Sequence, residues 1–488
     1  MQGRLDGYIT DLGYTHGYYR ELNPQWARLA FLKAGLAPPT VATACELGFG
    51  QGLSLAMHAA ASSVTWHGTD VNTEHVAFAG AMVRAAGVEA MLHQETFAEY
   101  AARRDLPDFD FIALNGVWSW VSDASRRCIV DFVRRRLRVG GLLFVSYNTL
   151  AGWAPHLALR ELLVARANDP ANRGAPLLDR IEEAIAFVGR SSETTPAMAE
   201  RLATIRGQDR RYVAHEYFND HFCPMPFSTV AAALAPAGVT YVGSAAIGEL
   251  PSVHLDRAER VQLQMVDGTV EREEMRDTLT NRPFRQDYWV KGPLVRLGET
   301  ERDRALRATR VVAAQPRPAL PVKLRVVLAL NGGELSESVY RPILDVLAEG
   351  RPVSLASIER TLAGVPLSQI FDAVLLIAGE KQLAPVQDER VAARAEKATA
   401  LLNAHILDML PDGEGLEHLA SPVTGGGVRV DRLAQLVLLA RRRGLREPQA
   451  WARLALQFSP ADDPGKVAAR AQSFAREELP LLQALQIA

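Results

Sequence analysis

Apolar runs and helical stretches alternate along residues 41–148. Four apolar runs have the length of strands. The stretches between them carry apolar residues three and four positions apart, which is typical of amphipathic helices. The last helical stretch carries Ile129, Phe132, Val133 and Leu137 at helical spacing and ends in Gly140-Gly141. This alternation predicts an α/β fold with a Rossmann-like, doubly wound, mostly parallel sheet. The expected strands are 41–47, 65–71, 109–115 and 141–148, and the expected helices are 53–61, 74–87 and 125–141.

The pattern changes after residue 148. Residues 152–210 are mainly helical and polar, and a helix (228–238) and a strand (239–245) follow them. We expect this helix and strand to return to the first sheet, so that the preceding helices form an insertion. Residues 250–315 are charged and mixed, without a clear period.

The remaining chain predicts mainly helical domains. Three prolines within residues 313–322 indicate a linker. Three short helices and a strand then outline a winged-helix-like module, whose third helix (368–380) contains no Arg or Lys. A helix that reads a DNA groove needs such donors, so we favour a packing or dimerisation module over a DNA reader. The last part of the chain holds a glycine turn (424–428) and two expected helices.

Composition narrows the function further. The chain has 54 Lys and Arg against 56 Asp and Glu, a net charge of −2, which makes a nucleic-acid partner unlikely. Its three cysteines form no CxxC pair, which excludes a zinc ribbon and fits a reducing compartment. We find neither a basic start followed by an apolar run nor an apolar stretch long enough for a membrane span. We therefore expect a cytoplasmic, globular protein with no membrane span.

The sharpest chemical signal is the motif Glu46-Leu-Gly48-Phe49-Gly50-Gln-Gly52, between an apolar strand and a helix. Alternate glycines allow positive φ and a close approach of backbone to ligand. The leading Glu46 suits an ammonium group better than a pyrophosphate, and the spacing differs from GxGxxG. Asp70 ends the next strand, where a ligand would lie, and could accept hydrogen bonds from both ribose hydroxyls of a nucleoside. The alternative is a tight turn with a surface aspartate.

On these features, residues 41–148 resemble a class I S-adenosylmethionine-dependent methyltransferase. The resemblance implies that the cofactor is S-adenosyl-L-methionine and the product S-adenosyl-L-homocysteine. It also implies the site residues: Glu46, Gly48, Phe49 and Gly50 for the methionine part, Asp70 and Val71 for the ribose, Glu95 or Thr96 near the adenine, Asn115 on the floor and Tyr14 in the lid.

The segments ACELGFGQGLS, FDFIALNGVWSWVSD, VSYNTLAGW, YVAHEYFND and FRQDYWVKG look like bacterial methyltransferases that carry a methyltransferase regulatory domain. Some of these are similar to lysine methyltransferases that act on bacterial outer-membrane proteins. One departure lies near the N-terminus, where many relatives have a YPxPxTHP-like stretch and this chain has Tyr14-Thr-His16-Gly-Tyr18. The N-terminal lid is therefore expected to shape a different substrate pocket.

Several residues near the expected strand ends are candidates for catalysis. Trp118, Trp120 and Tyr147 could contact the sulfonium or a lysine stem, or they could be core aromatics. Asn148 could orient a substrate amine or stabilise a turn.

His215 and Glu216 could supply a general base, or they could make a structural hydrogen bond. Tyr8, Tyr14, Tyr18 and Tyr19 could form a lid over the cofactor or merely pack on it. We expect no metal site, because the histidines show no HxH or HExxH grouping, and no serine hydrolase, because a GxSxG elbow is missing.

These observations predict an S-adenosylmethionine-dependent methyltransferase, and the resemblance implies a protein lysine as the acceptor. The alternatives are methylation of a small molecule or glycan precursor, and a non-catalytic regulator that binds the cofactor; a homodimer is compatible with each. We divide the chain into a methyltransferase core with its lid (1–150), a helical insertion for dimerisation or substrate (151–213), a return to the sheet (214–250), a regulatory or middle region with a linker (251–320), a winged-helix-like module (321–390) and a C-terminal helical domain (391–488).

Overall fold

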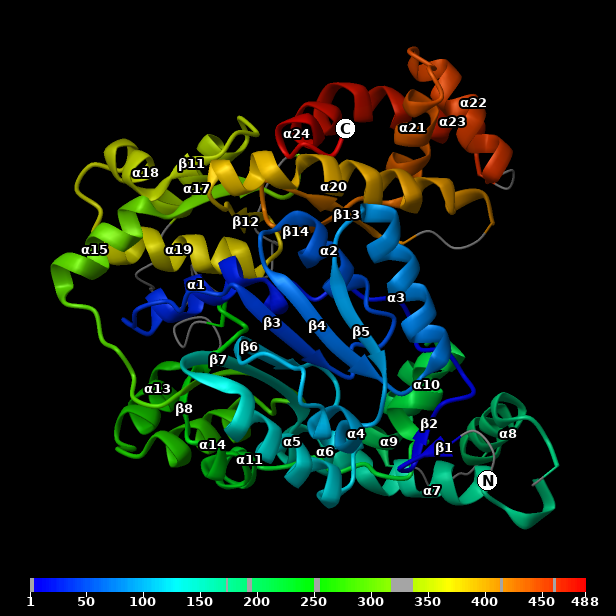
Figure 1. The fold of residues 1–488 in the computed structure, drawn as a ribbon. Coiled ribbons are helices and arrows are strands. Elements are labelled where there is room, and N and C mark those ends of the chain that lie inside the picture. Colours follow the sequence, from blue (N-terminus) through cyan, green and yellow to red (C-terminus); the bar gives the residue numbers. More distant parts are fainter. Residues whose placement is uncertain are drawn as a thin grey trace.

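A seven-stranded sheet in the order β5-β4-β3-β6-β7-β9-β8 forms the centre of the computed structural model (Figure 1). The structure describes residues 4–172, 174–190, 195–249, 255–316, 337–412, 416–459 and 462–488. The first five strands of this order run parallel, and β9 pairs antiparallel with both β7 and β8. The strands are β3 (Thr43–Leu47), β4 (Thr65–Asp70), β5 (Ala90–Gln94), β6 (Phe109–Leu114), β7 (Leu137–Asn148), β8 (Val239–Ser244) and β9 (Phe284–Lys291).

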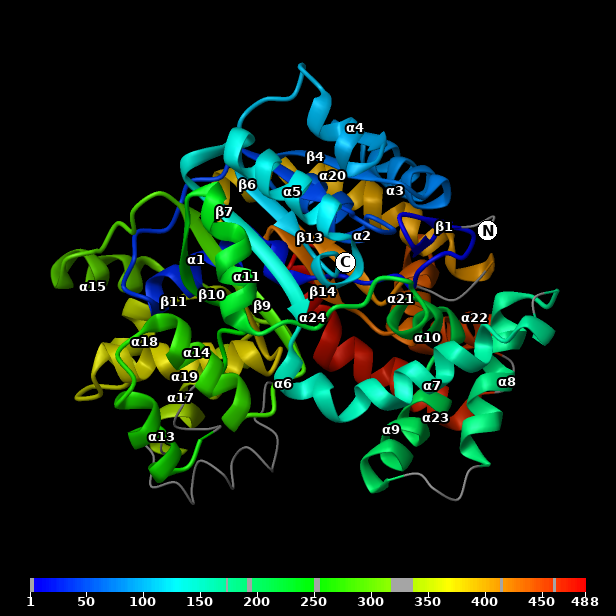
Figure 2. The ribbon, with the colours of Figure 1, turned by 90° about the horizontal axis from the view of Figure 1, so that it is seen from below.

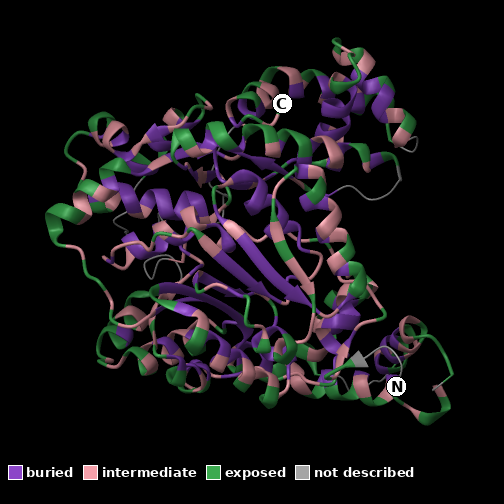
Figure 3. Cartoon of the chain, in the orientation of Figure 1, coloured by how far each residue is buried: buried purple, intermediate pink, exposed green. Residues whose placement is uncertain are grey.

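Helices cover both faces of the sheet, which confirms the predicted doubly wound fold. Alternate residues of each strand enter different cores: Ala44 packs in one cluster and Cys45 in the other. Next to the sheet, the first cluster includes residues of α1 (Pro24–Lys33), α2 (Leu53–Ala61) and α3 (Thr73–Ala86). The second takes them from α4 (Phe97–Ala102), α5 (Asp123–Arg136) and α11 (Phe227–Leu234). The central strands are consequently buried on both sides (Figure 3).

One expected helix is shorter than predicted. The stretch 125–141 is helical only as far as Arg136, where α5 ends, and Leu137 already begins β7. Leu137 pairs with Phe109 of β6 and is buried in the same core as Ile129. An apolar residue at this position satisfies both a helical period and the start of a strand, so periodicity could not separate the two.

Strand β9 was not expected at all. It lies between β7 and β8 although it comes last in the sequence. Its buried positions include Arg285 and Asp287, so the apolar alternation of an ordinary strand is broken. The two charged side chains are tolerated there because each is paired with the other at 2.8 Å.

A helical insertion follows β7. In Figure 2, β7 leads through α6 (Leu150–Trp153) into α7 (Leu157–Ala167). Together with α8 (Leu177–Gly189), α9 (Pro196–Arg206) and α10 (Arg210–Tyr217), α7 encloses a small core of its own. Ile9 of the N-terminal hairpin, β1 (Arg4–Leu5) and β2 (Tyr8–Ile9), also packs in this core. The insertion therefore lies against the N-terminus of the chain.

Helix α14 (Thr269–Leu279) packs beside α13 (Arg257–Gln264) and against α11, whereas α15 (Glu299–Ala308) packs against a module that holds a second, three-stranded sheet of order β11-β10-β12. The module that contains this second sheet consists, in chain order, of β10 (Arg310–Ala313), α17 (Glu337–Leu347), β11 (Val353–Ser354), α18 (Leu355–Thr361), α19 (Leu367–Gly379) and β12 (Leu383–Pro385). The third helix of the expected winged-helix-like module is α19, which is buried along most of its length. The end of the expected linker, from residue 317, lies outside the described residues.

The C-terminal part packs on the first sheet rather than standing apart. Helix α20 (Glu389–Asp408) lies across α2 and α3, and one apolar cluster continues from Trp66 of the sheet through Leu402 of α20. A hairpin, β13 (His418–Ser421) and β14 (Gly426–Arg429), follows. Four helices then replace the two expected, since prolines begin several short ones: α21 (Arg432–Arg442), α22 (Pro448–Phe458), α23 (Pro464–Ser473) and α24 (Leu479–Ala484). Within the described ranges, no helix is both long and apolar enough to span a membrane.

Candidate active site

A cavity of about 300 Å³ opens at the carboxyl ends of β3, β4 and β6. This is the edge at which doubly wound sheets bind ligands, and the volume lies in the range of small-molecule sites. All ten residues expected to bind the cofactor line it: Tyr14, Glu46, Gly48, Phe49, Gly50, Asp70, Val71, Glu95, Thr96 and Asn115.

The glycine loop between β3 and α2 needs its glycines. Gly48 has φ +70°, and a Cβ there would stand 2.7 Å from Val117. Gly50 has φ +57°, and its N–H donates to Oδ2 of Asp70 at 2.8 Å. Left-handed backbone and a close neighbour together exclude side chains, so the loop presents bare backbone to the cavity.

Glu46 is a buried carboxyl group facing this cavity. It is 2% exposed, and its Oε2 has no hydrogen-bond partner. Burial, with the nearby charge of Asp70, raises the pKa of Glu46 to about 8. A buried carboxylate without a partner requires a cation, and the ammonium group of an amino-acid tail has the right chemistry.

Asp70 is held by three donors from its own domain. Its Oδ2 accepts from the Gly50 N–H, and its Oδ1 accepts from the Asn72 N–H at 2.9 Å and from Nδ1 of His75 at 3.1 Å. A carboxylate has about four acceptor positions, so about one remains. Asp70 can therefore accept one ribose hydroxyl without rearrangement, rather than the two expected.

The far end of the cavity suits an adenine ring. Oε1 of Glu95 accepts from Arg103 at 2.8 Å, whereas its Oε2 is buried and has no partner. The Thr96 hydroxyl caps α4 by accepting from the Glu99 N–H at 3.2 Å. Flat apolar surface, with one free acceptor at its edge, comes from a further group of lining residues: Phe97, Val117, Val121 and Cys128.

Residues 4–19, here called the N-terminal lid, cover the cavity and bridge its two sides. On the cofactor side, Asn72 Nδ2 donates to Thr10 O at 3.0 Å and Gln51 Nε2 donates to Tyr14 O at 3.0 Å. On the side of α10, the lid is bound by Asn219 and Glu216. The lid therefore contacts both walls of the cavity.

Tyr14 and Glu216 meet at the α10 side. The Tyr14 hydroxyl donates to Oε1 of Glu216 at 3.0 Å, and burial raises the pKa of Glu216 to about 7 while this bond lowers it. The rings of Tyr8 and Tyr14 lie 5.3 and 5.1 Å from that of His215. Glu216 is thus a carboxyl group in an aromatic enclosure.

His215 lines the cavity, but its ring is anchored. Its Nε2 lies 3.0 Å from the Leu12 carbonyl oxygen, which a protonated Nε2 would satisfy. Desolvation by burial lowers the pKa of His215 to about 4, so the ring is neutral near pH 7. Trp120 also lines the cavity and packs against Phe222, with ring centroids 4.7 Å apart.

Three expected residues are placed elsewhere. Trp118 is fully buried in the core beside α5. Asn148 accepts from Trp153 Nε1 at 3.0 Å through its side-chain oxygen. The Tyr147 hydroxyl donates to Asp287 at 2.9 Å, on the far side of the strand from the cavity.

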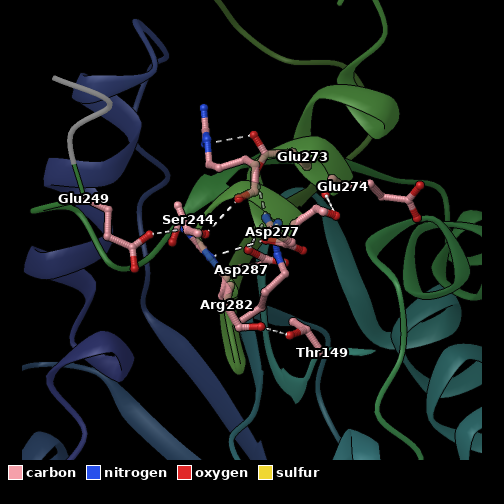
Figure 4. Close-up of polar contacts among 12 residues, drawn as sticks. Thr149, Ser244, Glu249, Glu273, Glu274, Asp277, Arg282 and Asp287 are labelled. Atoms are coloured by element: carbon pink, nitrogen blue, oxygen red, sulfur yellow. Dashed lines mark hydrogen bonds and ion pairs between the residues drawn. The ribbon is translucent and has the colours of Figure 1, made fainter. Parts of the chain in front are cut away.

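The contact of Tyr147 belongs to a buried ion cluster under the sheet (Figure 4). Arg285 is fully buried and donates to Asp277 and Glu273, each at 2.8 Å, as well as to Asp287. Arg282 extends the cluster to Asp277 at 3.3 Å. These charges neutralise one another, so the cluster fixes β9 against α14 and has no free group for catalysis.

Acidic groups dominate the cavity wall. Among the described residues that line it, none is Lys or Arg, and the one histidine is neutral near pH 7. An anionic substrate would meet only like charge here, whereas a cation would be attracted. The acidic lining residues are Asp6, Glu46, Asp70, Glu95 and Glu216.

Sequence reasoning missed several residues around the cavity. Gln51 lies within the glycine motif, but nothing in the sequence shows that its side chain binds the lid. His75 and Tyr212 have no motif at all, since they reach the site only through the packing of α3 and α10. In the part of the chain that the structure describes, no group of His, Cys, Asp and Glu could hold a metal ion.

The fold and the cavity define a Rossmann-like methyltransferase, and comparison with known proteins agrees. The family model called "predicted methyltransferase regulatory domain" matches residues 209–291. That range includes α10, with Glu216, and strands β8 and β9 of the sheet. The matched part is therefore built into the catalytic sheet and the cavity wall.

Relatives cover the whole chain. An uncharacterised protein of Synechocystis sp., sll1526, is 32% identical over 509 residues, 99% of each chain. An uncharacterised protein of Rickettsia prowazekii, RP789, is 27% identical over 49% of this chain and 44% of its own. The structure of PKMT2 from Rickettsia typhi in complex with AdoHcy has a TM-score of 0.70 at 18% identity, covering 97% of this chain and 100% of that one.

The chain belongs to the class I S-adenosylmethionine-dependent methyltransferases that carry a methyltransferase regulatory domain. Members of this class take the methyl group from S-adenosylmethionine. A methyl acceptor is thereby required, which neither the fold nor the family names.

Proposed function

We propose that this enzyme methylates the side-chain amine of lysine residues in a protein. The observation that supports this proposal is the environment of Glu216. Its carboxyl group is desolvated and hydrogen-bonded to Tyr14, in a cavity whose described lining contains no Lys or Arg. An amine is the acceptor that arrives as a cation and that a carboxylate can both bind and deprotonate. The fold shared with PKMT2 from Rickettsia typhi is consistent with this acceptor.

The cofactor would lie along the edge of the sheet. Glu46 would pair with its ammonium group, Asp70 with a ribose hydroxyl, and Glu95 Oε2 with the amino group of the adenine. Backbone of Gly48 and Gly50 would leave room for the methionine part. When bound, S-adenosylmethionine supplies an electrophilic methyl group on a sulfonium.

Glu216 would receive the proton that the acceptor must lose. A lysine ammonium has an ordinary pKa near 10.4, so most of the acceptor arrives protonated. Its proton passes to the Glu216 carboxylate, and the freed lone pair forms the new N–C bond as the C–S bond breaks. The methylated nitrogen is again cationic, so the proton must pass from Glu216 to solvent before the carboxylate can pair with the product.

Aromatic rings would guide the lysine stem toward Glu216. Tyr14 lies between His215 and Tyr212, whose ring centroid is 6.4 Å away. Such walls fit a flexible aliphatic chain and attract its cationic end. We assign His215 to holding the lid at Leu12, and Trp120 to the wall.

Trp118, Tyr147 and Asn148, which do not line the cavity, receive no role at the reacting atoms. We further propose that the insertion, residues 151–213, borders the entry of the acceptor, because α10 continues directly from it.

The decisive experiment uses methyl-tritiated S-adenosylmethionine with a cell lysate separated into proteins and small molecules. We expect label on protein, and acid hydrolysis should release it as Nε-methyllysine. Glu216→Gln should lower the rate at least about 100-fold, because a positioned proton acceptor contributes 10²–10⁴-fold. Glu200→Gln, which changes an exposed glutamate of α9, is the matched control and should be unchanged.

Label confined to the small-molecule fraction would replace this proposal with the small-molecule acceptor. Binding of S-adenosylhomocysteine without transfer to either fraction would favour the non-catalytic regulator. Label on protein that hydrolysis releases from another amino acid would refute the lysine assignment while leaving the methyltransferase intact.

A further inference from the structure

We propose that His75 is a positioning residue that couples cofactor binding at Asp70 to the placement of Tyr14 in the acceptor site. His75 stands in the first turn of α3 and is fully buried. No motif marks it, and it does not line the cavity. The inference rests on the proposed function only where it concerns the acceptor.

The ring of His75 makes two hydrogen bonds that together fix its tautomer. Its Nε2 accepts from the Tyr14 N–H at 3.3 Å, so this nitrogen carries a lone pair. The proton of a neutral ring then lies on Nδ1, which donates to Oδ1 of Asp70 at 3.1 Å. A single neutral imidazole ring therefore forms one hydrogen bond with the lid backbone and another with the ribose-binding carboxylate.

The position of the ring is set by the start of α3. Asn72 caps the helix, its Oδ1 accepting from the N–H groups of Glu74 and His75 at 2.9 and 3.3 Å. The Asn72 side chain also reaches the lid, donating to Thr10 O. Because α3 packs in the main core, the ring of His75 has a fixed base from which to hold the lid.

Tyr14 is the residue through which this contact would reach the acceptor. His75 holds its N–H, Gln51 holds its carbonyl oxygen, and its hydroxyl meets Glu216. A continuous chain of bonds thus runs from Asp70 through His75 and Tyr14 to Glu216. Its first member faces the ribose position and its last member faces the acceptor.

Cofactor binding would strengthen this chain. A ribose hydroxyl that donates to the remaining acceptor position of Asp70 keeps the carboxylate oriented toward Nδ1 of His75. The lid is then held more firmly at Tyr14, whose hydroxyl contacts Glu216. Bound cofactor would therefore favour the arrangement that receives the acceptor, which predicts an ordered reaction in which the cofactor binds first.

Hydrogen exchange tests the coupling without any acceptor. In the wild-type enzyme, saturating S-adenosylhomocysteine should slow exchange in residues 8–19 as well as in the glycine loop. In His75→Gln, at a concentration that saturates the variant, the glycine loop should remain protected while residues 8–19 are not. His16→Gln alters a histidine of the lid itself, whose ring packs on Phe78, and should behave as wild type.

Affinity and turnover give a second readout. The Kd of S-adenosylhomocysteine should rise about 10- to 100-fold in His75→Gln, since a hydrogen bond to a charged group is lost. With saturating cofactor, the KM for the acceptor should rise as well, which simple loss of the cofactor contact would not cause. If His75→Gln does not fold, Gln51→Met, which frees the Tyr14 carbonyl, should show the same loss of lid protection.

Equal protection of residues 8–19 with and without S-adenosylhomocysteine in the wild type would overturn the inference. So would unchanged lid protection in a folded, saturated His75→Gln. Neither outcome would touch the lysine proposal, because that depends on which fraction carries the label.

Discussion

Glu46 and Asp70 end two neighbouring parallel strands, and their carboxyl groups face one cavity. Glu46 pairs with Gly68 in the register of β3 and β4, so Asp70 follows two positions further on. Burial, and then the Asp70 charge, raises the pKa of Glu46 to about 8. The binding of an ammonium group would favour the ionised form of Glu46, so cation binding and loss of the Glu46 proton are linked.

Binding of S-adenosylhomocysteine should therefore release a proton. Below pH 8 the free enzyme holds Glu46 protonated, and the ligand requires the carboxylate. We expect affinity to rise between pH 6 and about 8, by up to about tenfold per unit. Calorimetry in two buffers of different ionisation enthalpy measures the release. Glu46→Gln should bind more weakly and release no proton; a variant that still released one would assign it to another group.

The same carboxyl group should make the free enzyme less stable as the pH rises. The folded pKa of about 8 exceeds the ordinary 4.5, so the folded chain binds more protons than the unfolded chain between these values. Stability contributed by protonated Glu46 is then lost from pH 4.5 to 8, by on the order of 5 kcal/mol. Measured by urea unfolding, the free energy of unfolding of Glu46→Gln should rise relative to that of the wild type as the pH increases across this range. A constant difference between the two proteins would contradict the raised pKa.

Tyr14→Phe should shift the pH dependence of turnover. The Tyr14 hydroxyl lowers the pKa of Glu216, which burial has raised to about 7. Removing the hydroxyl raises this pKa further, so the acidic limb of kcat/KM should move to higher pH and activity at pH 7 should fall. Tyr212→Phe removes a neighbouring hydroxyl and should leave the limb in place. An unshifted limb in Tyr14→Phe would exclude Glu216 as the group that titrates.

Gly48→Ala and Gly50→Ala separate steric contact from backbone strain. Both positions have positive φ, which costs a non-glycine residue about 1–2 kcal/mol. Only Gly48 has a neighbour in the way, Val117 at 2.7 Å, whereas space at Gly50 is open. Affinity for S-adenosylhomocysteine should fall more in Gly48→Ala, and Val117→Ala should restore part of it. Equal losses without rescue would show that strain alone decides.

Arg285→Met should strongly destabilise the enzyme. It leaves Asp277, Glu273 and Asp287 buried around a vanished cation, and breaking such a cluster costs about 3–5 kcal/mol. Urea unfolding measures the loss. Arg307→Met removes an exposed ion pair with Glu359 and should change the stability little, because solvent screens such a pair. Similar values for the two variants would mean that the buried cluster adds nothing.

The sequence was most informative where function requires a residue at a strand end. Glu46 and Asp70 could be placed because parallel strands end at one edge, and the glycines between them mark a loop. Tyr147 and Asn148 could not be placed reliably, because side chains alternate along β7. Ser146 faces the cavity side, where it bonds Asn115 and Gly116, so Tyr147 points toward Asp287 instead.

The remaining features could not be predicted from the sequence because they depend on contacts between residues that are far apart in the chain. Strand β9 was hidden because its interior positions are charged, and the partners that neutralise Arg285 lie on other elements. His75 was hidden for a similar reason: its two bonds reach backward to Tyr14 and Asp70, and neither spacing forms a recognisable pattern. Pairings of this kind depend on tertiary structure, which local periodicity does not encode.

The place of β9 bears on how the chain is made. This strand enters between β7 and β8, so the sheet stays open at β7 until residue 291 has left the ribosome. Until then, the edge of β7 and the carboxylates meant for Arg285 are exposed to water and to other nascent chains. Newly made enzyme should consequently pass through an aggregation-prone stage that ends abruptly when β9 arrives, and slowing translation before that point should lower its yield.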